Sequence, residues 1–273
     1  MTVQKRPRGR PRLAATPAEA PLATLDRAVA LLRLLADRPG LSLTAAAEAA
    51  GLPPSSTHRI LTTLQRHGLV EFEEPAQTWH IGAEAFRIGT AFLARRKVAD
   101  RARPVLHALV AATGETANLA LPEPDAVLFV AQAETHAPIR AFFRPGTRSP
   151  YHASGAGKAI LAALDDETLR RRLATLRLDR FTDRTLADRT GLIRDLLKTR
   201  ARGFAIDDEE RFEGMRCVAA AIRDETGAPV AALSISGPTV RLTKARVLAL
   251  GPEVARAAED VTRAIGGMLG DQK

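Results

Sequence analysis

A glycine-rich turn, YHASGAGKAILAAL at 151–164, carries the most readable chemistry in the second half of this 273-residue chain. An apolar helical pattern follows it directly, so a helix should begin near Gly155 and Ala156. The first backbone N–H groups of a helix have no partner within it, and the helix dipole favours negative charge there. The turn therefore predicts a binding site for a small anion such as a carboxylate. A purely structural glycine turn is the alternative interpretation.

A nucleotide-binding phosphate loop does not fit the same stretch. The pattern GxxxxGK[ST] would require glycine at 152 and serine or threonine at 159, but the chain has His152 and Ala159. The anion expected at this turn is therefore not the phosphate chain of a nucleotide.

Four further polar side chains fall on segments with strand-like patterns. Asp207 ends GFAIDD (203–208) and can accept hydrogen bonds from a ligand hydroxyl, and Cys217 opens CVAAAIRD (217–224). Ser234 and Ser236 alternate with apolar neighbours, so both hydroxyls face one side of their strand. A lone cysteine in an apolar strand is typically a small buried hydrophobe rather than a nucleophile. No histidine adjoins Cys217 or the serines in sequence, so these residues suit binding of a small polar anion better than nucleophilic catalysis.

A second kind of chemistry is indicated by LSLTAAAEAAGLPPSSTHRILTTLQRHGL at 41–69. The small residues Ala46, Ala47 and Ala50 predict a short first helix, which Gly51 ends. Ser55 or Ser56 is expected to cap a second helix extending to 67. Two short helices around a tight turn are the arrangement that places a recognition helix in the DNA major groove.

The second helix has one apolar and one polar face. Ile60, Leu61 and Leu64 form its expected core face. The opposite face should offer hydrogen-bonding side chains to bases and phosphates, and the expected DNA-binding residues are Ser55, Ser56, Thr57, His58, Arg59 and Thr63. A helical hairpin with a solvated polar face is the alternative.

The segments around this motif complete a DNA-binding domain. LDRAVALLRLLADR (25–38) predicts a supporting helix, and LVEF (69–72) and TWHI (78–81) predict a β-hairpin wing. Residues 83–99 form an amphipathic pattern that predicts a connecting helix and a dimer contact. The wing tip is acidic, which disfavours strong contact with phosphates.

The N-terminal residues 1–22 are rich in Arg, Pro and Ala, and we expect them to be disordered. RPRGRPR (6–12) resembles an AT-hook, in which Arg8 and Arg10 would enter a narrow minor groove on either side of Gly9. A basic tail that binds phosphates without sequence preference is the alternative.

The net charge is +9, and basic residues concentrate in this tail and in 86–103, which favours a nucleic-acid partner. No apolar run approaches the roughly 20 residues that cross a bilayer, and a secretory signal is absent from the N-terminal residues. One cysteine and scattered histidines indicate neither an internal disulfide nor a metal site. We therefore expect a cytoplasmic protein without a membrane or metal partner.

From about 103 the pattern changes to mixed helices and strands. Helices are predicted at 103–113, 156–164, 166–174, 189–201 and 243–268, and strands at 118–121, 126–133, 139–144, 203–208, 217–224 and 230–238. The predicted fold class is α+β, with four parts: a disordered basic tail (1–22), a winged helix-turn-helix (23–83), a linker helix (84–102) and an effector-binding domain (103–270).

With these motifs in order, the chain resembles the IclR family of bacterial transcription regulators from about 24 to 268. The resemblance rests on LDRAVALLRLLA, GLPPSSTHRILTTLQRHG, the wing ending WHIG, HASGAGKAILA, DDEE, RCVAAAIRDETG and SISGPTVRLT. It implies a winged helix-turn-helix, a GAF-like effector domain, and a homodimer or homotetramer on double-stranded operator DNA. It implies no enzyme activity and no cofactor.

Within that family, HASGAGKA, DDEE, RCVAA and SISGP are similar to the branch named for the isocitrate lyase regulator, which senses glyoxylate and pyruvate. The chain also resembles the regulator of the β-hydroxyaspartate cycle, which is another glyoxylate pathway. The resemblance implies glyoxylate, a small 2-oxo acid, as the effector, held by Gly155, Ala156, Asp207, Cys217, Ser234 and Ser236. The expected pocket wall departs from that branch at Arg140, Arg144 and Ser149.

Two other functions stay open at this point. The same kind of regulator could sense an aromatic or sugar acid, which would need a larger and more apolar pocket. An enzyme domain fused to a DNA-binding head is the more remote alternative.

Overall fold

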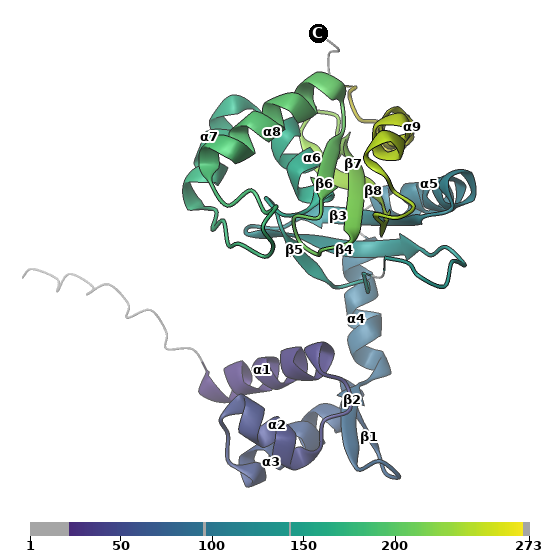
Figure 1. Cartoon of the computed structure of the whole chain (residues 1–273). Coiled ribbons are helices and arrows are strands. Elements are labelled where there is room, and N and C mark those ends of the chain that lie inside the picture. The colour runs from purple at the N-terminus through teal and green to yellow at the C-terminus, as the bar shows by residue number, and fades with distance from the viewer. Residues whose placement is uncertain (1–21, 95–96, 142, 270–273) are drawn as a thin grey trace, which may run out of the picture. The chain divides into compact units, whose positions relative to one another are not determined.

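The computed structural model describes residues 22–94, 97–141 and 143–269, and the side chains at 91–97 are not among those described (Figure 1). The chain divides after Phe92 into two compact units. Each unit has its own hydrophobic core.

The N-terminal unit is built from helices and one hairpin. Its elements are α1 (Ala23–Asp37), α2 (Leu43–Ala50), α3 (Pro54–Arg66), β1 (Val70–Glu73), β2 (Thr78–Ile81) and the start of α4 (Ala83–Ala94). Its core gathers Leu35, Leu61, Leu64, Val70 and Trp79. The antiparallel hairpin β1–β2 follows α3 directly, as expected for a wing.

The turn between α2 and α3 has the structure that the sequence predicted, except at the start of α3. Ser42 caps α2 by accepting a hydrogen bond from the Ala45 amide, and Gly51 ends the helix with φ +63°, a left-handed conformation that favours glycine. The prediction that Ser55 or Ser56 caps the next helix is wrong, because α3 begins at Pro54 and Pro53 occupies the cap position without a side-chain bond. Proline is well suited to the first helical position, where its missing N–H has no intrahelical partner to lose.

The segment between the units also differs from expectation. A single helix was expected over 83–99 and a second from 103. The structure instead has α4 ending at Ala94 and α5 running from Lys97 to Thr113.

A six-stranded antiparallel sheet forms the centre of the C-terminal unit. Its strand order is β5-β4-β3-β8-β7-β6. The strands are β3 (Thr116–Pro122), β4 (Ala126–Ala133), β5 (Arg148–Pro150), β6 (Ala205–Asp208), β7 (Met215–Arg223) and β8 (Pro229–Pro238).

Helices cover both faces of this sheet (Figure 1). α5 and α9 (Lys244–Ala264) pack on one face around Leu106, Leu233 and Val254. α6 (Gly155–Ala163), α7 (Asp166–Thr175) and α8 (Arg189–Arg202) form a second core with the opposite face. The expected α+β class is confirmed.

One predicted strand is wrong. No strand forms among the described residues of 139–144, where Ile139 is 69% exposed. The strand that pairs with β4 is β5, several residues later, at 148–150. The alternation at 139–144 therefore belongs to an irregular segment rather than to the sheet.

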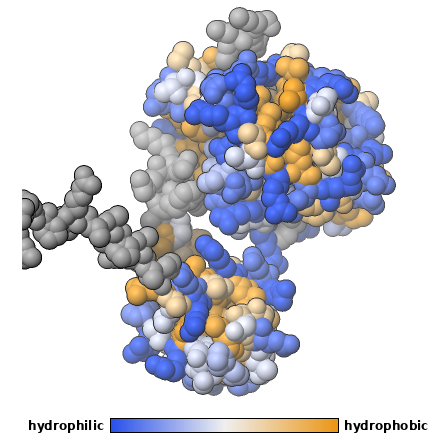
Figure 2. All heavy atoms as spheres, turned by 90° about the vertical axis from the view of Figure 1, so that its left-hand side faces the viewer, coloured by the Kyte–Doolittle hydropathy of each residue, from blue (hydrophilic) through white to orange (hydrophobic). Residues whose placement is uncertain are grey.

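The surface seen in Figure 2 mixes polar and apolar side chains in both units. Among the described residues, no helix is long and apolar enough to span a membrane.

Candidate effector cavity and DNA-binding helix

A small cavity lies between the start of α6 and the sheet, with a volume of about 20 Å³. That is about the room one water molecule needs. Five of the six predicted effector residues line it, namely Gly155, Ala156, Asp207, Cys217 and Ser236. Residues of α6, β6, β7 and β8 thus meet at one site.

The start of α6 has free backbone donors at this cavity. The Ser154 hydroxyl accepts from the Gly157 amide at 3.1 Å, and the Ser154 carbonyl accepts from the Lys158 amide at 3.0 Å. The amides of Gly155 and Ala156 precede these bonds and have no partner within the helix. They are the two groups the sequence predicted as anion donors.

Glycine at 155 and 157 permits the close approach that builds the cavity. A Cβ at Gly155 would lie 2.8 Å from the Cys217 sulfur, and a Cβ at Gly157 would lie 2.4 Å from the Tyr151 carbonyl oxygen. Such distances are far below van der Waals contact, so Gly155 lets the helix start sit against β7, and Gly157 lets it sit against the turn that precedes it.

The sheet supplies the opposite wall. Asp207 pairs with Cys217 across β6 and β7, and Cys217 pairs with Ser236 across β7 and β8, so the three side chains share one face. Ser234 lies two residues along β8 on that face, opposite Ala219, and does not line the cavity. The prediction that both serines face the same side is confirmed, although Ser234 lies deeper.

Charges beside the cavity form a buried network. The Lys158 ammonium is completely buried and lies 2.5 Å from a Glu210 carboxylate oxygen and 3.0 Å from one of Asp195. Burial raises the pKa of Asp207 to about 6, and Lys158 opposes that rise. Burial also raises the pKa of Glu210 to about 8, with Lys158 again opposing and Asp207 adding to the rise. The Lys158 ammonium therefore interacts electrostatically with three carboxyl groups, those of Asp195, Asp207 and Glu210.

The Cys217 thiol is not an activated nucleophile. Burial raises its pKa to about 12, and the nearby Asp207 carboxylate adds to the rise. A thiolate would be needed for nucleophilic attack or metal binding, so Cys217 serves as a small packing residue at the cavity wall. Among the described residues, no cluster of metal-ligating side chains is present.

Sequence reasoning missed Lys158 and Arg211. Arg211 lines the cavity, and its guanidinium lies 4.2 Å from the centre of the Phe181 ring. The rings of Phe129 and Phe143 stack with their centres 4.9 Å apart, and both side chains belong to the apolar part of the cavity lining. A lysine inside the apolar pattern of 155–163, and the arginine directly after DDEE, were the available signals.

Of the three residues Arg140, Arg144 and Ser149, which were expected in the pocket wall, only Ser149 is found there. Ser149 is buried and lines the cavity. Arg140 and Arg144 are exposed and do not line it, and Arg140 pairs with Glu134 at 3.0 Å.

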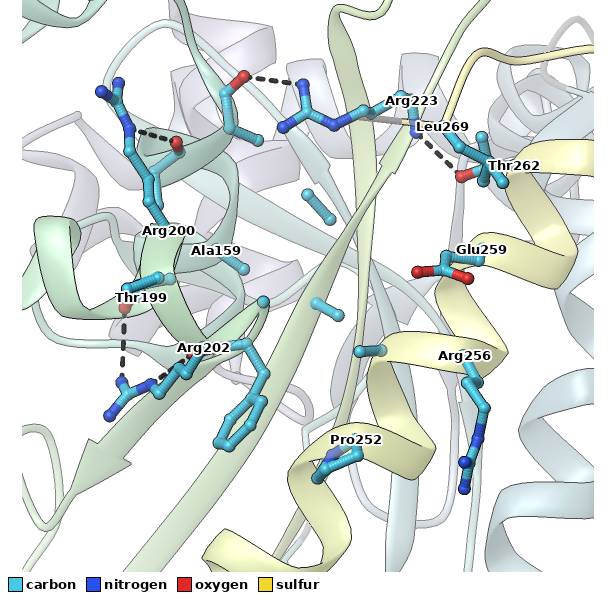
Figure 3. Close-up of a pocket in the computed structure, with 18 of the residues that line it drawn as sticks. Ala159, Thr199, Arg200, Arg202, Arg223, Pro252, Arg256, Glu259, Thr262 and Leu269 are labelled. Carbon is cyan, nitrogen blue, oxygen red and sulfur yellow. Dashed lines mark hydrogen bonds between the residues drawn. The ribbon is translucent and has the colours of Figure 1, made fainter. Parts of the chain in front are cut away.

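A much larger hollow in the C-terminal unit lies elsewhere, with a volume of about 1210 Å³. Residues of α8, β7 and α9 line it, including Arg200, Arg223 and Arg256 (Figure 3). Two of these arginines are tied to backbone carbonyls: Arg200 binds the carbonyls of Ala162 and Leu164, and Arg223 binds those of Ala163 and Gly227. None of the predicted effector residues line this hollow.

In the N-terminal unit, α3 presents most of the predicted DNA-binding side chains. Ser55, His58, Arg59 and Thr63 are exposed, and Ser56 is half-buried. Thr57 was wrongly expected on this face: it is fully buried, and its hydroxyl donates to the Pro53 carbonyl at 3.2 Å. Arg8 and Arg10 lie outside the described residues.

Comparison with known proteins agrees with both units. The family model described as "IclR helix-turn-helix domain" matches residues 24–74, and "Bacterial transcriptional regulator IclR C-terminal" matches 90–263. The HTH-type transcriptional regulator BhcR of Paracoccus denitrificans is 49% identical over 266 residues, which cover 96% of this chain and 95% of that protein.

Solved structures of regulators share the fold. The IclR protein of Thermotoga maritima superposes with a TM-score of 0.76 at 28% identity, covering 89% of this chain and 98% of the other. An IclR homologue from Microbacterium hydrocarbonoxydans, complexed with 4-hydroxybenzoate, has a TM-score of 0.74 at 25% identity, covering 89% and 100%. With its helix-turn-helix, its α+β effector domain and these matches, the chain belongs to the IclR family and is a DNA-binding transcriptional regulator controlled by a small-molecule effector, not an enzyme.

Proposed function

We propose that the cavity at the start of α6 binds a small 2-oxo acid, glyoxylate above all, and that this ligand sets the affinity for operator DNA. The observation that supports this proposal most is that the free amides of Gly155 and Ala156 line the same very small cavity as Asp207 and Arg211. Helix N-termini favour carboxylates, and the Arg211 cation adds to that preference.

Glyoxylate in water is largely a hydrated gem-diol, with one carboxylate and two hydroxyls. In the proposed complex its carboxylate accepts from the amides of Gly155 and Ala156, aided by Ser236. Asp207 accepts from a diol hydroxyl, and Cys217 packs against the C–H end. The reverse orientation would place two carboxylates together in a partly dry space, which Coulomb repulsion disfavours.

The size of the cavity supports a short ligand. A volume of about 20 Å³ holds little more than a water molecule, so even glyoxylate requires the half-buried Phe143 and Arg211 to shift outward. An aromatic acid would require a much larger rearrangement.

An aromatic acid is nevertheless the second candidate, because the Microbacterium homologue is complexed with 4-hydroxybenzoate. The stacked pair Phe129 and Phe143 could flank a ring if Phe143 swung away. A sugar acid has no comparable support from the lining residues.

For the DNA-binding head, we propose that Ser55, Ser56, His58, Arg59 and Thr63 contact the operator and that the basic tail adds phosphate or minor-groove contacts. A homodimer or homotetramer would present two such heads to the two halves of an operator.

Calorimetric titration of the full chain with glyoxylate, pyruvate, C4 oxo acids and 4-hydroxybenzoate tests the effector. We expect glyoxylate to bind most tightly. Asp207→Ala should weaken its binding by about 1–3 kcal/mol, because the diol donors lose their acceptor. Pyruvate, which hydrates less, should depend less on Asp207.

Arg140→Ala is a matched control, since this exposed side chain does not line the cavity. Equal glyoxylate affinity for the wild type and Asp207→Ala would overturn the assignment of Asp207. Absence of glyoxylate binding at millimolar concentration would overturn the effector.

A further inference from the structure

Three buried polar atoms on the cavity side of the sheet have no hydrogen-bond partner. They are Thr116 Oγ1, Asn118 Nδ2 and Ser234 Oγ, of which Ser234 Oγ lies near the weakly hydrogen-bonding Cys217 thiol. The three side chains are at most 1% exposed. Buried polar groups in folded proteins nearly always have partners, so an unpartnered cluster points to a bound group.

The strand register places these residues next to the cavity. Thr116 pairs with Ser236 across β3 and β8, and Ser236 lines the cavity. Asn118 pairs with Ser234 in the same two strands. Directly paired residues share a face, and residues two apart on a strand do so too, so all three side chains continue the floor that Cys217 and Ser236 begin.

The start of α6 covers this part of the floor. Ser234 pairs with Ala219, and a Cβ at Gly155 would lie 3.4 Å from the Ala219 Cβ. Ser234 therefore lies one strand away from the part of β7 that the helix start contacts, and Thr116 and Asn118 lie on β3, the next strand beyond it.

The chemistry of the three atoms selects a neutral oxygen. Asn118 Oδ1 already accepts from Gln132 Nε2 at 2.8 Å, which leaves its Nδ2 as a donor. The two hydroxyls can donate or accept. All three side chains are uncharged, so a second carboxylate placed among them would lose its hydration without gaining a cation.

We infer that Thr116, Asn118 and Ser234 form an inner subsite that binds a neutral oxygen function, a hydroxyl or carbonyl, at the far end of a small 2-oxo acid. This inference rests on the proposed effector cavity. A gem-diol hydroxyl of glyoxylate or the hydroxyl of 3-hydroxypyruvate fits this subsite, whereas the methyl group of pyruvate leaves its donors unpaired.

Pyruvate and 3-hydroxypyruvate form a matched pair that differs by one hydroxyl. In calorimetric titrations of the full chain, 3-hydroxypyruvate should bind the wild type about three- to tenfold more tightly, the worth of one net hydrogen bond. Thr116→Val keeps the side-chain shape and removes the hydroxyl. It should abolish this preference while leaving pyruvate affinity within about twofold.

Removing an unpartnered buried hydroxyl should not destabilise the ligand-free protein, so the thermal midpoint of Thr116→Val should equal or exceed that of the wild type. Ser234→Ala provides a second test if Thr116→Val does not fold. Thr199→Val is the control, because this buried threonine lies in α8, away from the cavity, and accepts a hydrogen bond from Arg202. It should retain the preference.

Pyruvate binding without any preference for 3-hydroxypyruvate in the wild type would overturn the inference alone. The inference would also be overturned if both Thr116→Val and Ser234→Ala kept the full preference for 3-hydroxypyruvate over pyruvate. Failure of both acids to bind the wild type would overturn the proposed effector class and the inference with it.

Discussion

Replacing Lys158 with methionine should destabilise the C-terminal unit more than any change at its surface. The side chain is 0% exposed, and its ammonium is shared by Glu210 at 2.5 Å and Asp195 at 3.0 Å. Lys158→Met keeps an unbranched apolar stem that is one atom shorter than the lysine side chain. It leaves the buried Glu210 carboxylate without its cation, whereas Asp195 keeps the Arg202 guanidinium at 3.9 Å.

At pH 8.5, above the raised pKa of Glu210, breaking this buried ion pair from one side costs about 3–5 kcal/mol, because the remaining charge stays in a poorly hydrated environment. In a domain of this size each kcal/mol lowers the midpoint of thermal unfolding by about 2–4 °C, so the expected loss is about 6–20 °C. Circular dichroism on heating measures it. The double variant Lys158→Met/Glu210→Gln removes charge from both partners and should recover part of the loss.

The pH dependence has a defined sign. The pKa of Asp207, raised to about 6, and that of Glu210, raised to about 8, both exceed the ordinary values near 4, so folding favours their protonated forms. This contribution to stability is complete below pH 4 and is lost as the pH rises through 6 and 8. Without Lys158 both carboxyls are still harder to ionise, so the loss in Lys158→Met should be smaller at pH 5 than at pH 8.5. A midpoint within 2 °C of the wild type at pH 8.5 would refute the role of Lys158 as the shared counter-ion.

Three further predictions concern DNA and effector binding. Arg59→Ala should weaken binding to the operator by about 1–3 kcal/mol at fixed salt, as measured by fluorescence anisotropy; unchanged affinity would remove Arg59 from the recognition surface. Deleting residues 1–12 removes five basic side chains and should make the dependence of log affinity on log salt shallower. An unaltered slope would mean that the tail does not touch DNA, and a loss confined to A·T-rich flanks would favour the AT-hook. Gly155→Val should abolish glyoxylate binding measured by calorimetry, because even its Cβ would lie 2.8 Å from the Cys217 sulfur; wild-type affinity in this variant would show that the helix start does not form the site.

Local rules were sufficient for much of the fold. The strand at 126–133 was predicted at its observed bounds, and Gly51 marked the end of its helix because only a left-handed residue closes that turn. The prediction of a strand at 139–144 was wrong because alternation of apolar and polar residues does not by itself distinguish a paired strand from an irregular surface segment.

Thr57 shows a different kind of error. It was assigned to the DNA face by its polarity, although it lies four residues before Leu61 on the same side of the helix. Its buried hydroxyl is satisfied by the Pro53 carbonyl, so polarity alone misplaced a residue that spacing places correctly.

The proposed effector residues could be named from the sequence because each lies in a recognisable motif, whereas the charge network around Lys158 could not be predicted. Lys158 is 37 residues from Asp195 and 52 from Glu210, and nothing local indicates that they meet. Thr116 and Asn118 were missed for the same reason, since their position beside Ser236 and Ser234 depends on strands more than a hundred residues apart.

The most direct test of the central claim is the affinity of the full chain for an operator fragment, selected by the protein from random duplexes, with and without glyoxylate at fixed salt and pH. Fluorescence anisotropy should show a shift in the dissociation constant, and this shift should occur at glyoxylate concentrations between the dissociation constants of glyoxylate for the free and the DNA-bound protein, as linkage requires. The shift should be reduced in Asp207→Ala and intact in Arg140→Ala. An operator affinity that does not change at saturating glyoxylate would contradict the account.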